Sequence, residues 1–308
     1  MPLGNGEVDL PDDGKVIEFV AECGRDGISC GDFLRQCGVS RRLVTKLKRM
    51  PMGITRGGEL IRTIDTVHKG DVITLKNPDE SFLEANEGLI VPVAYEDENL
   101  VIFNKPAGMP VHPSIKHQGD TLGNCFSAMY QGLTFRPINR LDKDTSGLCA
   151  VAKSAHAANV YSGKIDKVYF AVTEGKPVPL KKIQGIEWTE TESGYRIDAP
   201  IGRAGESIIR REVRQDGQRA VTNYTIIKEN AMHSLVRVVL ETGRTHQIRV
   251  HFSSVGHPLA GDDFYGGSLE YCKTQALHCG EMSFPLHNGD IMLVPCPLRE
   301  DMAEIVSD

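Results

Sequence analysis

From residue 89 onward the chain is a series of short apolar runs separated by polar turns, and this pattern limits the fold more than any other feature. The runs at residues 89–94 and 100–104, for example, flank the polar turn 96–99, and short runs bounded by turns are typical of β-strands. Because the predicted strands outnumber the predicted helices and do not alternate strictly with them, we expect an α+β fold rather than a doubly wound α/β fold. The other expected strands are 148–152, 168–172, 220–227, 234–240 and 291–294, and the expected helices are 121–130, 154–164 and 246–254.

Residues 77–88 form a polar, turn-like break that divides the chain. A chain of 308 residues is long enough for two domains. We therefore expect an N-terminal domain over residues 1–80, a linker over 81–90 and a larger domain over 91–308.

The N-terminal part carries a charge pattern that the net charge of −6 conceals. The first 30 residues are acidic, whereas basic residues predominate between residues 35 and 58 and include Arg41, Arg42 and Lys46. These three lie in an expected helix over residues 41–49, whose apolar residues share one face. A phosphate backbone responds to a local patch rather than to total charge, so we interpret this helix as an RNA contact. A solvated charged face is the alternative interpretation.

No segment of the sequence predicts export or membrane insertion. The first 13 residues are polar and acidic, and no window approaches 18 uncharged apolar residues. The eight cysteines include no Cys-x-x-Cys pair, which argues against a structural zinc site and favours buried free thiols. We therefore expect a cytoplasmic protein with no membrane association, and we take a monomer as the default oligomeric state.

Residues 139–148, Asn-Arg-Leu-Asp-Lys-Asp-Thr-Ser-Gly-Leu, hold the strongest candidate chemistry. Arg140 stands two positions before Asp142, and a Thr-Ser-Gly turn leads into the apolar run that follows. A carboxylate and a guanidinium in a loop ahead of a buried element indicate a candidate catalytic corner. The stretch closely resembles the signature of RluA-type pseudouridine synthases, His-Arg-Leu-Asp-x-x-Thr-Ser-Gly, which carries their catalytic aspartate.

Three more blocks support this resemblance and follow the family's order. They lie at residues 96–113, 167–172 and 243–266. The resemblance implies an α+β catalytic domain, the pseudouridine synthase fold, built on a mainly antiparallel mixed sheet with flanking helices and loops. Residues 15–78 in turn resemble the small α/β RNA-binding module named after ribosomal small-subunit protein S-four. The blocks that carry this second resemblance are 31–34, 39–44, 53–54 and 69–73.

The resemblance also implies a role for each candidate site residue. Pseudouridine formation detaches uracil from C1′ of the ribose, rotates it and rejoins it through C5, so the nucleotide must be flipped out of its stack. Asp142 would be the essential carboxylate, Arg249 the cation that keeps it ionised, and Tyr169 the ring that stacks on uracil. Ile248 would pack against the other side of the base, and Arg140 would help to expel the base and fill its place.

Asn139 departs from the family signature, which has histidine at this position. An asparagine can replace some hydrogen bonds of an imidazole but cannot carry its charge. We expect Asn139 to contribute to substrate binding, and the departure to affect base flipping and substrate choice rather than the catalytic aspartate.

The sequence thus predicts a pseudouridine synthase that acts on structured RNA, ribosomal RNA first and transfer RNA next. It needs no metal and no organic cofactor, because isomerisation is redox-neutral. A zinc deaminase would need a Pro-Cys-x-x-Cys segment, and Pro295-Cys296-Pro297 has no second cysteine three residues on. The alternative that stays open is an inactive RNA-binding, RNA-folding or ribosome-assembly factor. Whether the aspartate attacks ribose, adds to the base or removes a sugar proton also stays open.

Overall fold

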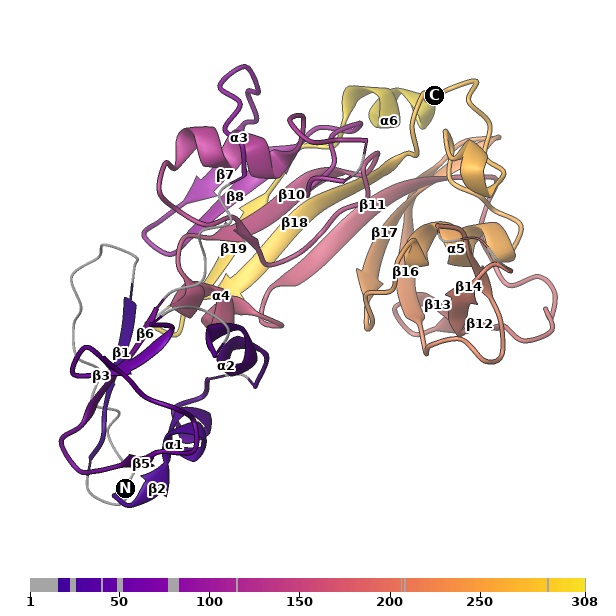
Figure 1. Ribbon diagram of the computed structural model, residues 1–308. Helices are drawn as coiled ribbons and strands as arrows, with labels where there is room; N and C mark the ends of the chain where they lie inside the picture. Colours follow the sequence, from indigo (N-terminus) through magenta and orange to yellow (C-terminus); the bar gives the residue numbers. More distant parts are fainter. Residues whose placement is uncertain are drawn as a thin grey trace. The chain divides into compact units, whose positions relative to one another are not determined.

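The computed structural model describes residues 16–22, 26–39, 41–48, 52–76, 83–114, 116–205, 207, 209–286 and 288–307. The chain divides into two compact units (Figure 1). The first comprises residues 1–82 and 132–134, and the second comprises residues 83–131 and 135–308. Each unit is described by itself below.

The first unit packs two short helices against a small antiparallel sheet. The helices are α1 (Cys30–Gln36) and α2 (Arg41–Leu47), and Ser29 caps α1 by accepting a hydrogen bond from the backbone N–H of Asp32. Phe33, Leu34 and Ile73 lie in the core, fully buried. The four-stranded sheet has the order β1 (Val16–Val20), β6 (Val72–Lys76), β3 (Ile54–Arg56), β4 (Glu59–Leu60), and β2 (Ile28–Ser29) pairs separately with β5 (Thr66–Val67).

The second unit is built on one long sheet of eleven strands (Figure 1). All neighbouring strands in it run antiparallel except β10 and β18, which are parallel. This arrangement confirms the expected α+β class. The order is β12 (Glu187–Thr191), β13 (Gly194–Asp198), β16 (Val221–Glu229), β17 (His233–Leu240), β11 (Asp166–Glu174), β18 (Leu277–Pro285), β10 (Ser146–Ala152), β8 (Leu100–Lys105) and β7 (Val93–Glu96), with β19 (Ile291–Pro295) on β18 and β9 (Arg136–Pro137) on β10.

Helices flank this sheet at several places. The three predicted helices are confirmed, each slightly shortened: α3 (Leu122–Met129), α4 (Ala155–Tyr161) and α5 (Gln247–Ser254). Figure 1 draws α3 at the end of the sheet that holds β7 and β8, and α5 at the other end, where it contacts β16. The remaining elements are the hairpin β14 (Ile201–Arg203) and β15 (Arg211–Val213), the 3₁₀ turn η1 (Asp263–Tyr265), and α6 (Glu300–Ile305).

Strand β10 lies at the centre of the sheet, and every one of its residues is buried. Its near-continuous apolar sequence fits a strand that is covered on both faces. Gly147 has φ +100°, and a Cβ there would lie 2.2 Å from the carbonyl oxygen of Cys279 on β18. Only glycine permits this close parallel pairing directly after the Asp142 loop.

One strand was predicted with the wrong bounds, and several strands were not predicted, among them a central one. The first strand runs over β7, 93–96, rather than 89–94, because Asp97 closes the turn by accepting hydrogen bonds from the backbone N–H groups of Asn99 and Leu100. The strand can therefore continue up to Glu96. The central strand β18 was missed, because its His-Cys-Gly-Glu segment is neither an apolar run nor an alternating pattern.

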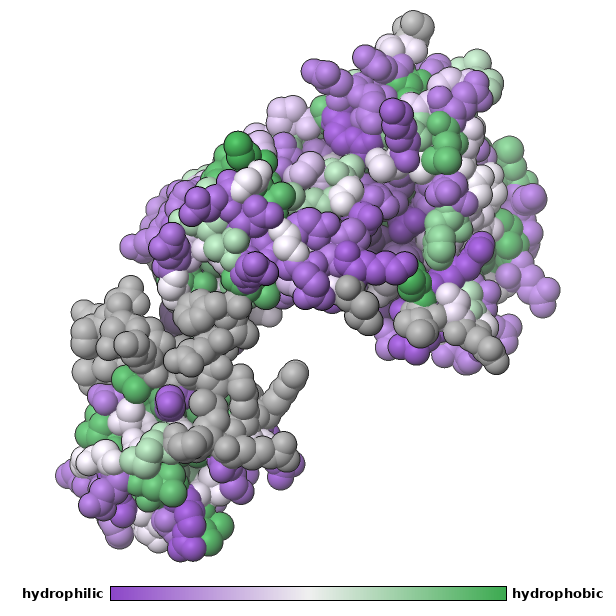
Figure 2. Space-filling view, turned by 45° about the horizontal axis from the view of Figure 1, so that its top comes forward, coloured by the Kyte–Doolittle hydropathy of each residue, from purple (hydrophilic) through white to green (hydrophobic). Residues whose placement is uncertain are grey.

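The cysteines and the surface complete this description. Seven cysteines are described, all free thiols, and six of them are buried. Figure 2 shows hydrophobic side chains scattered among hydrophilic ones on the visible face of the larger unit. Among the described residues, no helix is long and apolar enough to cross a membrane.

Candidate active site

Asp142 lies in the loop that leads directly into β10, and its side chain is 29% exposed. The turn is closed by a hydrogen bond from the backbone N–H of Thr145 to the carbonyl oxygen of Asp142. Leu141, the preceding residue, is buried. The carboxylate is thus held between a buried residue and a buried strand while remaining open to solvent on one side.

Arg249, from the first turn of α5, lies beside this carboxylate. Its Nη1 is 3.5 Å from Oδ2 of Asp142, a long contact. Its two short hydrogen bonds go to Asp262: Nε donates to Oδ2 and Nη2 to Oδ1, each at 2.7 Å. Both side chains of this second pair are almost completely buried. Arg249 is therefore clamped by Asp262 and directs its remaining Nη1 group toward Asp142.

The electrostatics keep Arg249 charged. Burial lowers its pKa, but the hydrogen bonds and charge of Asp262, with the charge of Asp142, outweigh burial and raise the pKa above its usual value. The guanidinium also lies over the ring of Tyr265, 4.8 Å from its centroid, where a cation–π contact is favourable. A permanent positive charge therefore faces Asp142.

His246 is a second neighbour of Asp142. Its Nε2 lies 3.9 Å from Oδ2 of Asp142, and its Nδ1 lies 2.8 Å from the hydroxyl of Tyr265. That hydroxyl already accepts a hydrogen bond from the backbone N–H of Arg211, so its own proton is free to be donated to Nδ1. Burial lowers the pKa of His246, against the raising effect of Asp142. If Nδ1 accepts the hydroxyl proton of Tyr265, the neutral imidazole carries its own proton on Nε2, which faces Asp142.

Helix α5 holds Arg249 and His246 in place through its first residue. Gln247 is buried; its Nε2 donates to the carbonyl oxygen of Val221 and its Oε1 accepts from the backbone N–H of Arg244. His246 itself adopts φ +57°, a left-handed conformation that is uncommon outside glycine. This combination turns the chain sharply and points both side chains toward Asp142.

Lys105, the last residue of β8, holds the Asp142 loop in place through hydrogen bonds from its buried side chain. It is completely buried, and its Nζ donates to the carbonyl oxygens of Pro106, Met109 and Lys143 at 2.7–2.9 Å. Burial lowers its pKa to about 8, against the raising effects of Cys149, Asp144 and Asp142. One ammonium group therefore ties the loop after β8 to the residue that follows Asp142.

Tyr169 on β11 is buried, with 8% of its surface exposed. Burial raises the pKa of its hydroxyl well above the usual value, and the charge of Asp142 adds to this effect. The pairing of β11 with β18 shifts register between Val168 and Tyr169, where Gly280 is left unpaired. Bulges of this kind re-aim side chains and are frequent next to active sites.

The other predicted site residues differ in how they are placed. Ile248 is buried, and Arg140 is exposed with no ion-pair partner among the described residues. The amide of Asn139 is used by β10: its Oδ1 accepts from the N–H of Ala150 at 2.8 Å, and its Nδ2 donates to the carbonyl of Leu148 at 3.3 Å. This geometry favours an anchoring role for Asn139, and substrate contact stays a prediction.

The basic residues of the N-terminal unit are only partly described. Arg41 is exposed on α2, whereas the side chains of Arg42 and Lys46 lie outside the described residues. Their contact with RNA stays a prediction.

Sequence reasoning assigned no role to Asp262, His246, Tyr265 or Lys105. Three of them belong to the block 243–266 and Lys105 to the block 96–113, both quoted for the family resemblance. The available signal was an acid and a tyrosine held at fixed spacing after a glycine, Gly-Asp-x-x-Tyr-Gly. Among the described residues, no group of three or more His, Cys, Asp or Glu side chains is arranged to hold a metal ion.

Comparison with known proteins identifies the family of this chain. The family model for RNA pseudouridylate synthase matches residues 99–254, about half of the chain. An uncharacterized RNA pseudouridine synthase of Bacillus subtilis, YjbO, is 35% identical over 89% of this chain and 97% of its own length. Ribosomal large subunit pseudouridine synthase D of Pseudomonas aeruginosa is 34% identical over 82% of this chain and 83% of its own length.

A solved structure shows the same fold. The human RNA pseudouridylate synthase domain containing 1 superposes with a TM-score of 0.55 at 24% identity, covering 70% of this chain and 86% of that chain. The family match spans the Asp142 loop, β11 with Tyr169, and the first turns of α5 with Arg249. The chain therefore belongs to the RluA-type RNA pseudouridine synthases, which are isomerases.

Proposed function

We propose that this enzyme converts uridine to pseudouridine in ribosomal RNA, with Asp142 as its essential carboxylate. The observation that carries the proposal is the partly exposed Asp142 carboxylate facing the clamped cation Arg249. The Pseudomonas aeruginosa relative is named for the large ribosomal subunit, which makes its RNA the first substrate to test. Transfer RNA is the next.

The reaction needs no oxidant or reductant. The bond between N1 and C1′ breaks, a bond between C5 and C1′ forms, C5 loses a proton and N1 gains one. Each use considered for the carboxylate, attack at C1′, addition to the base or removal of a sugar proton, requires it to be ionised. Arg249 places a positive charge 3.5 Å from this carboxylate, where it attracts negative charge.

Asp262 makes this electrostatic environment permanent. Arg249 is fixed by two short hydrogen bonds, so it does not have to reorganise when charge on Asp142 changes during the reaction. Preorganised charges of this kind account for much of the rate enhancement in many enzymes. The neutral imidazole of His246 would supply one more hydrogen-bond donor to Asp142 once substrate closes the site.

The base must reach Asp142 from outside a stack, so we propose that the uridine is flipped. Tyr169 supports this step as a buried ring on β11, at the point where the pairing with β18 is bulged. Stacking on such a ring contributes about 1–3 kcal/mol per base. The exposed guanidinium of Arg140 is available to occupy the space that the base leaves.

We assign RNA binding outside the site to the N-terminal unit, through the α2 face that carries Arg41, Arg42 and Lys46. The exposure of Arg41 supports this assignment. The S-four-like identity of this unit, its boundary near residue 80, the cytoplasmic location and the monomeric state stay predictions.

Tritium release from RNA labelled at C5 of uridine tests the proposed function. The parent protein should release tritium from ribosomal RNA, and Asp142→Asn should release none while still binding the RNA. Asp144→Asn, in the same loop, is the matched control and should keep activity. Turnover by Asp142→Asn would overturn the role of the aspartate. Absence of release by the parent from ribosomal and transfer RNA would favour the alternative, an inactive RNA-binding or assembly factor.

A further inference from the structure

Phe264 is a large hydrophobic residue that stays at the surface beside the candidate active site, with 39% of its area exposed. It is the middle residue of the 3₁₀ turn η1. The Gly-Asp-x-x-Tyr-Gly pattern leaves its position open, so the family resemblance assigns it no role. Single exposed hydrophobic residues are common on protein surfaces, so a function for Phe264 has to be argued from its surroundings.

The turn that carries Phe264 is held in place on both sides. Asp262, just before the turn, accepts the two short hydrogen bonds from Arg249. Tyr265, just after Phe264, is buried, and its carbonyl oxygen accepts a hydrogen bond from Oγ of Ser253 at 2.7 Å. The ring is therefore carried by a preorganised backbone, which lowers the entropic cost of a contact with a ligand.

Phe264 is linked to Asp142 through His246. The ring centroids of Phe264 and His246 are 6.2 Å apart, with the two planes nearly perpendicular, and Nε2 of His246 lies 3.9 Å from Oδ2 of Asp142. Consecutive nucleotides of a strand are joined by a single phosphate. A nucleotide bound at Asp142 would therefore bring its neighbour in the strand close to this ring.

Two guanidinium groups lie over the ring without covering it tightly. That of Arg210 is 5.6 Å from the Phe264 centroid, and that of Arg249 is 5.9 Å from it. Both distances are near the outer limit of about 6 Å for a cation–π contact. The ring therefore keeps area for a further contact, in agreement with its exposure.

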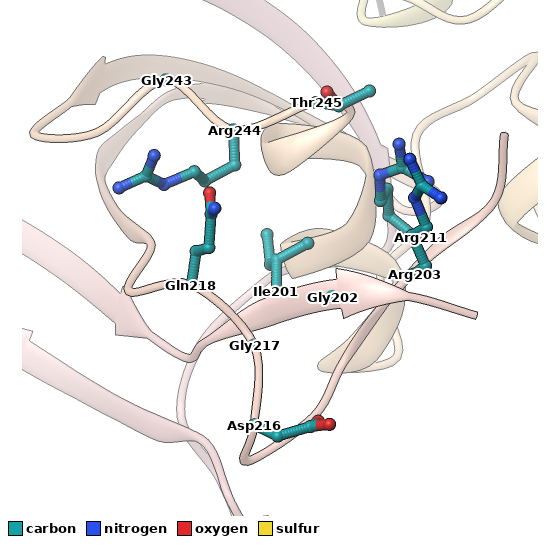
Figure 3. A pocket seen from close by; sticks show the side chains of 10 residues that line it. All are labelled: Ile201, Gly202, Arg203, Arg211, Asp216, Gly217, Gln218, Gly243, Arg244 and Thr245. Carbon is teal, nitrogen blue, oxygen red and sulfur yellow. The ribbon is translucent and has the colours of Figure 1, made fainter. Parts of the chain in front are cut away.

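The hairpin β14–β15 places more basic residues beside this turn. Arg203 and Arg211 are cross-strand partners, and Figure 3 shows their guanidinium groups close together, whereas that of Arg244 points away from them. The backbone N–H of Arg211 donates to the hydroxyl of Tyr265, which joins the hairpin to the turn. This surface thus combines an exposed ring with basic side chains, the two kinds of group that bind single-stranded nucleic acid.

We propose that Phe264 contacts the base of the nucleotide next to the uridine held at Asp142. The proposal rests on the proposed function and extends it from the target base to its neighbour in the strand. The neighbouring base would stack on the exposed ring of Phe264, as the target uracil would stack on Tyr169. Because every base has a flat face, this contact would position the strand without selecting its sequence.

The first test compares substitutions by their Kd for an unmodified large-subunit ribosomal RNA transcript and by kcat/KM for tritium release. Phe264→Ala should weaken binding and lower kcat/KM roughly 5- to 150-fold. Phe264→Tyr keeps a ring and should recover most of this loss. The matched control is Tyr271→Ala, at an aromatic residue that is 43% exposed and packs against His233, and it should leave both quantities unchanged. Urea unfolding should be nearly unchanged for both alanine variants, since both rings are partly exposed.

The second test detects stacking independently of turnover. Phe264→Trp places an indole at this position, and the parent, whose single tryptophan Trp188 is buried, supplies the background emission. A base that stacks on the introduced indole should quench its emission when the ribosomal RNA transcript binds. Heparin, a polyanion without bases, should not produce this quenching.

Two results would overturn the proposal. The first is a loss in Phe264→Ala no larger than that in Tyr271→Ala. The second is an indole emission that bound RNA leaves unchanged, or that heparin changes equally, because the ring would then meet no base.

Failure of this inference can be told apart from failure of the proposed function. If the parent releases tritium but Phe264→Ala behaves like Tyr271→Ala, the function stands and the stacking contact does not. If the parent releases none but RNA still quenches the indole, the ring binds a base in a protein without this activity.

Discussion

Arg249 makes its short, bidentate hydrogen bonds with Asp262 rather than with Asp142, to which it holds only a 3.5 Å contact. The cation at the site is therefore shared unequally between a buried structural partner and the exposed candidate catalytic carboxylate. Asp262 compensates the buried positive charge of Arg249. Asp142 therefore does not have to be buried against Arg249 and can stay open to substrate.

Replacing Asp262 with asparagine should harm both stability and catalysis. The amide removes the charge that compensates Arg249, and breaking a buried ion pair costs about 3–5 kcal/mol. We expect the free energy of unfolding in urea to fall by about 3 kcal/mol and tritium release to fall at least tenfold. Asp263→Asn, at the exposed neighbouring position, is the control. Equal effects of the two substitutions would contradict the proposed clamp.

Lys105 should make stability depend on pH. Its pKa is about 8 in the folded protein because of burial, below the value of 10.5 for a free lysine. Between these values the unfolded chain binds more protons, so stability rises with pH. We expect the difference in unfolding free energy between the parent and Lys105→Met to move in favour of the parent by up to about 3 kcal/mol from pH 7.5 to 10. Other titrating groups cancel in this difference, and a constant value across the range would refute the pKa shift.

Tyr169 should act through its ring. Burial keeps the pKa of its hydroxyl well above neutral pH, so the phenol stays uncharged. We expect Tyr169→Phe to retain most activity and Tyr169→Ala to lower kcat/KM by roughly 10- to 100-fold, the equivalent of a lost base stack. Urea unfolding of both variants separates this effect from the cavity that alanine leaves. Losses of similar size in the two variants would point to the hydroxyl instead.

Asn139 should matter more for stability than for the chemical step. Its amide satisfies the N–H of Ala150 and the carbonyl of Leu148, and leaving such groups unsatisfied costs about 1–3 kcal/mol. We expect Asn139→Ala to lower the free energy of unfolding by about that amount, with kcat changed less than threefold. Asn139→His, which restores the family residue, tests substrate choice. A normal unfolding curve for Asn139→Ala together with a large loss of RNA affinity would instead favour direct substrate contact.

The basic face of α2 should supply salt-dependent RNA affinity. We expect the slope of log K for RNA binding against log salt concentration to become shallower by about two when Arg41→Gln is combined with Arg42→Gln. The control combines Arg35→Gln with Arg62→Gln, because both of these arginines are already paired with aspartates. An unchanged slope for the first pair would mean that RNA binds elsewhere.

Local patterns predicted the elements that depend on near neighbours. The helix expected over 121–130 and the strand expected over 148–152 formed as α3 and β10, and the capping box of Thr121 with Asn124 that begins α3 lies within a few residues. Strand β18 did not follow such a pattern. β18 lies between β10 and β11, which pair with its two edges, and the periodicity of a single sequence carries no information about such partners.

In the site, too, some features follow from short motifs and others from contacts between segments that are remote in sequence. The family and the Asp142 loop could be recognised from the sequence, because the residues of each motif stand together along the chain, and the family resemblance named Tyr169 and Arg249 as candidate partners. The folded structure was needed to see that Arg249, 107 residues away from Asp142, divides its hydrogen bonds between two aspartates, and that Lys105 and His246 lie at the same site. Strand pairing and the entry angle of α5 set these distances, and both depend on contacts between segments that are remote in sequence.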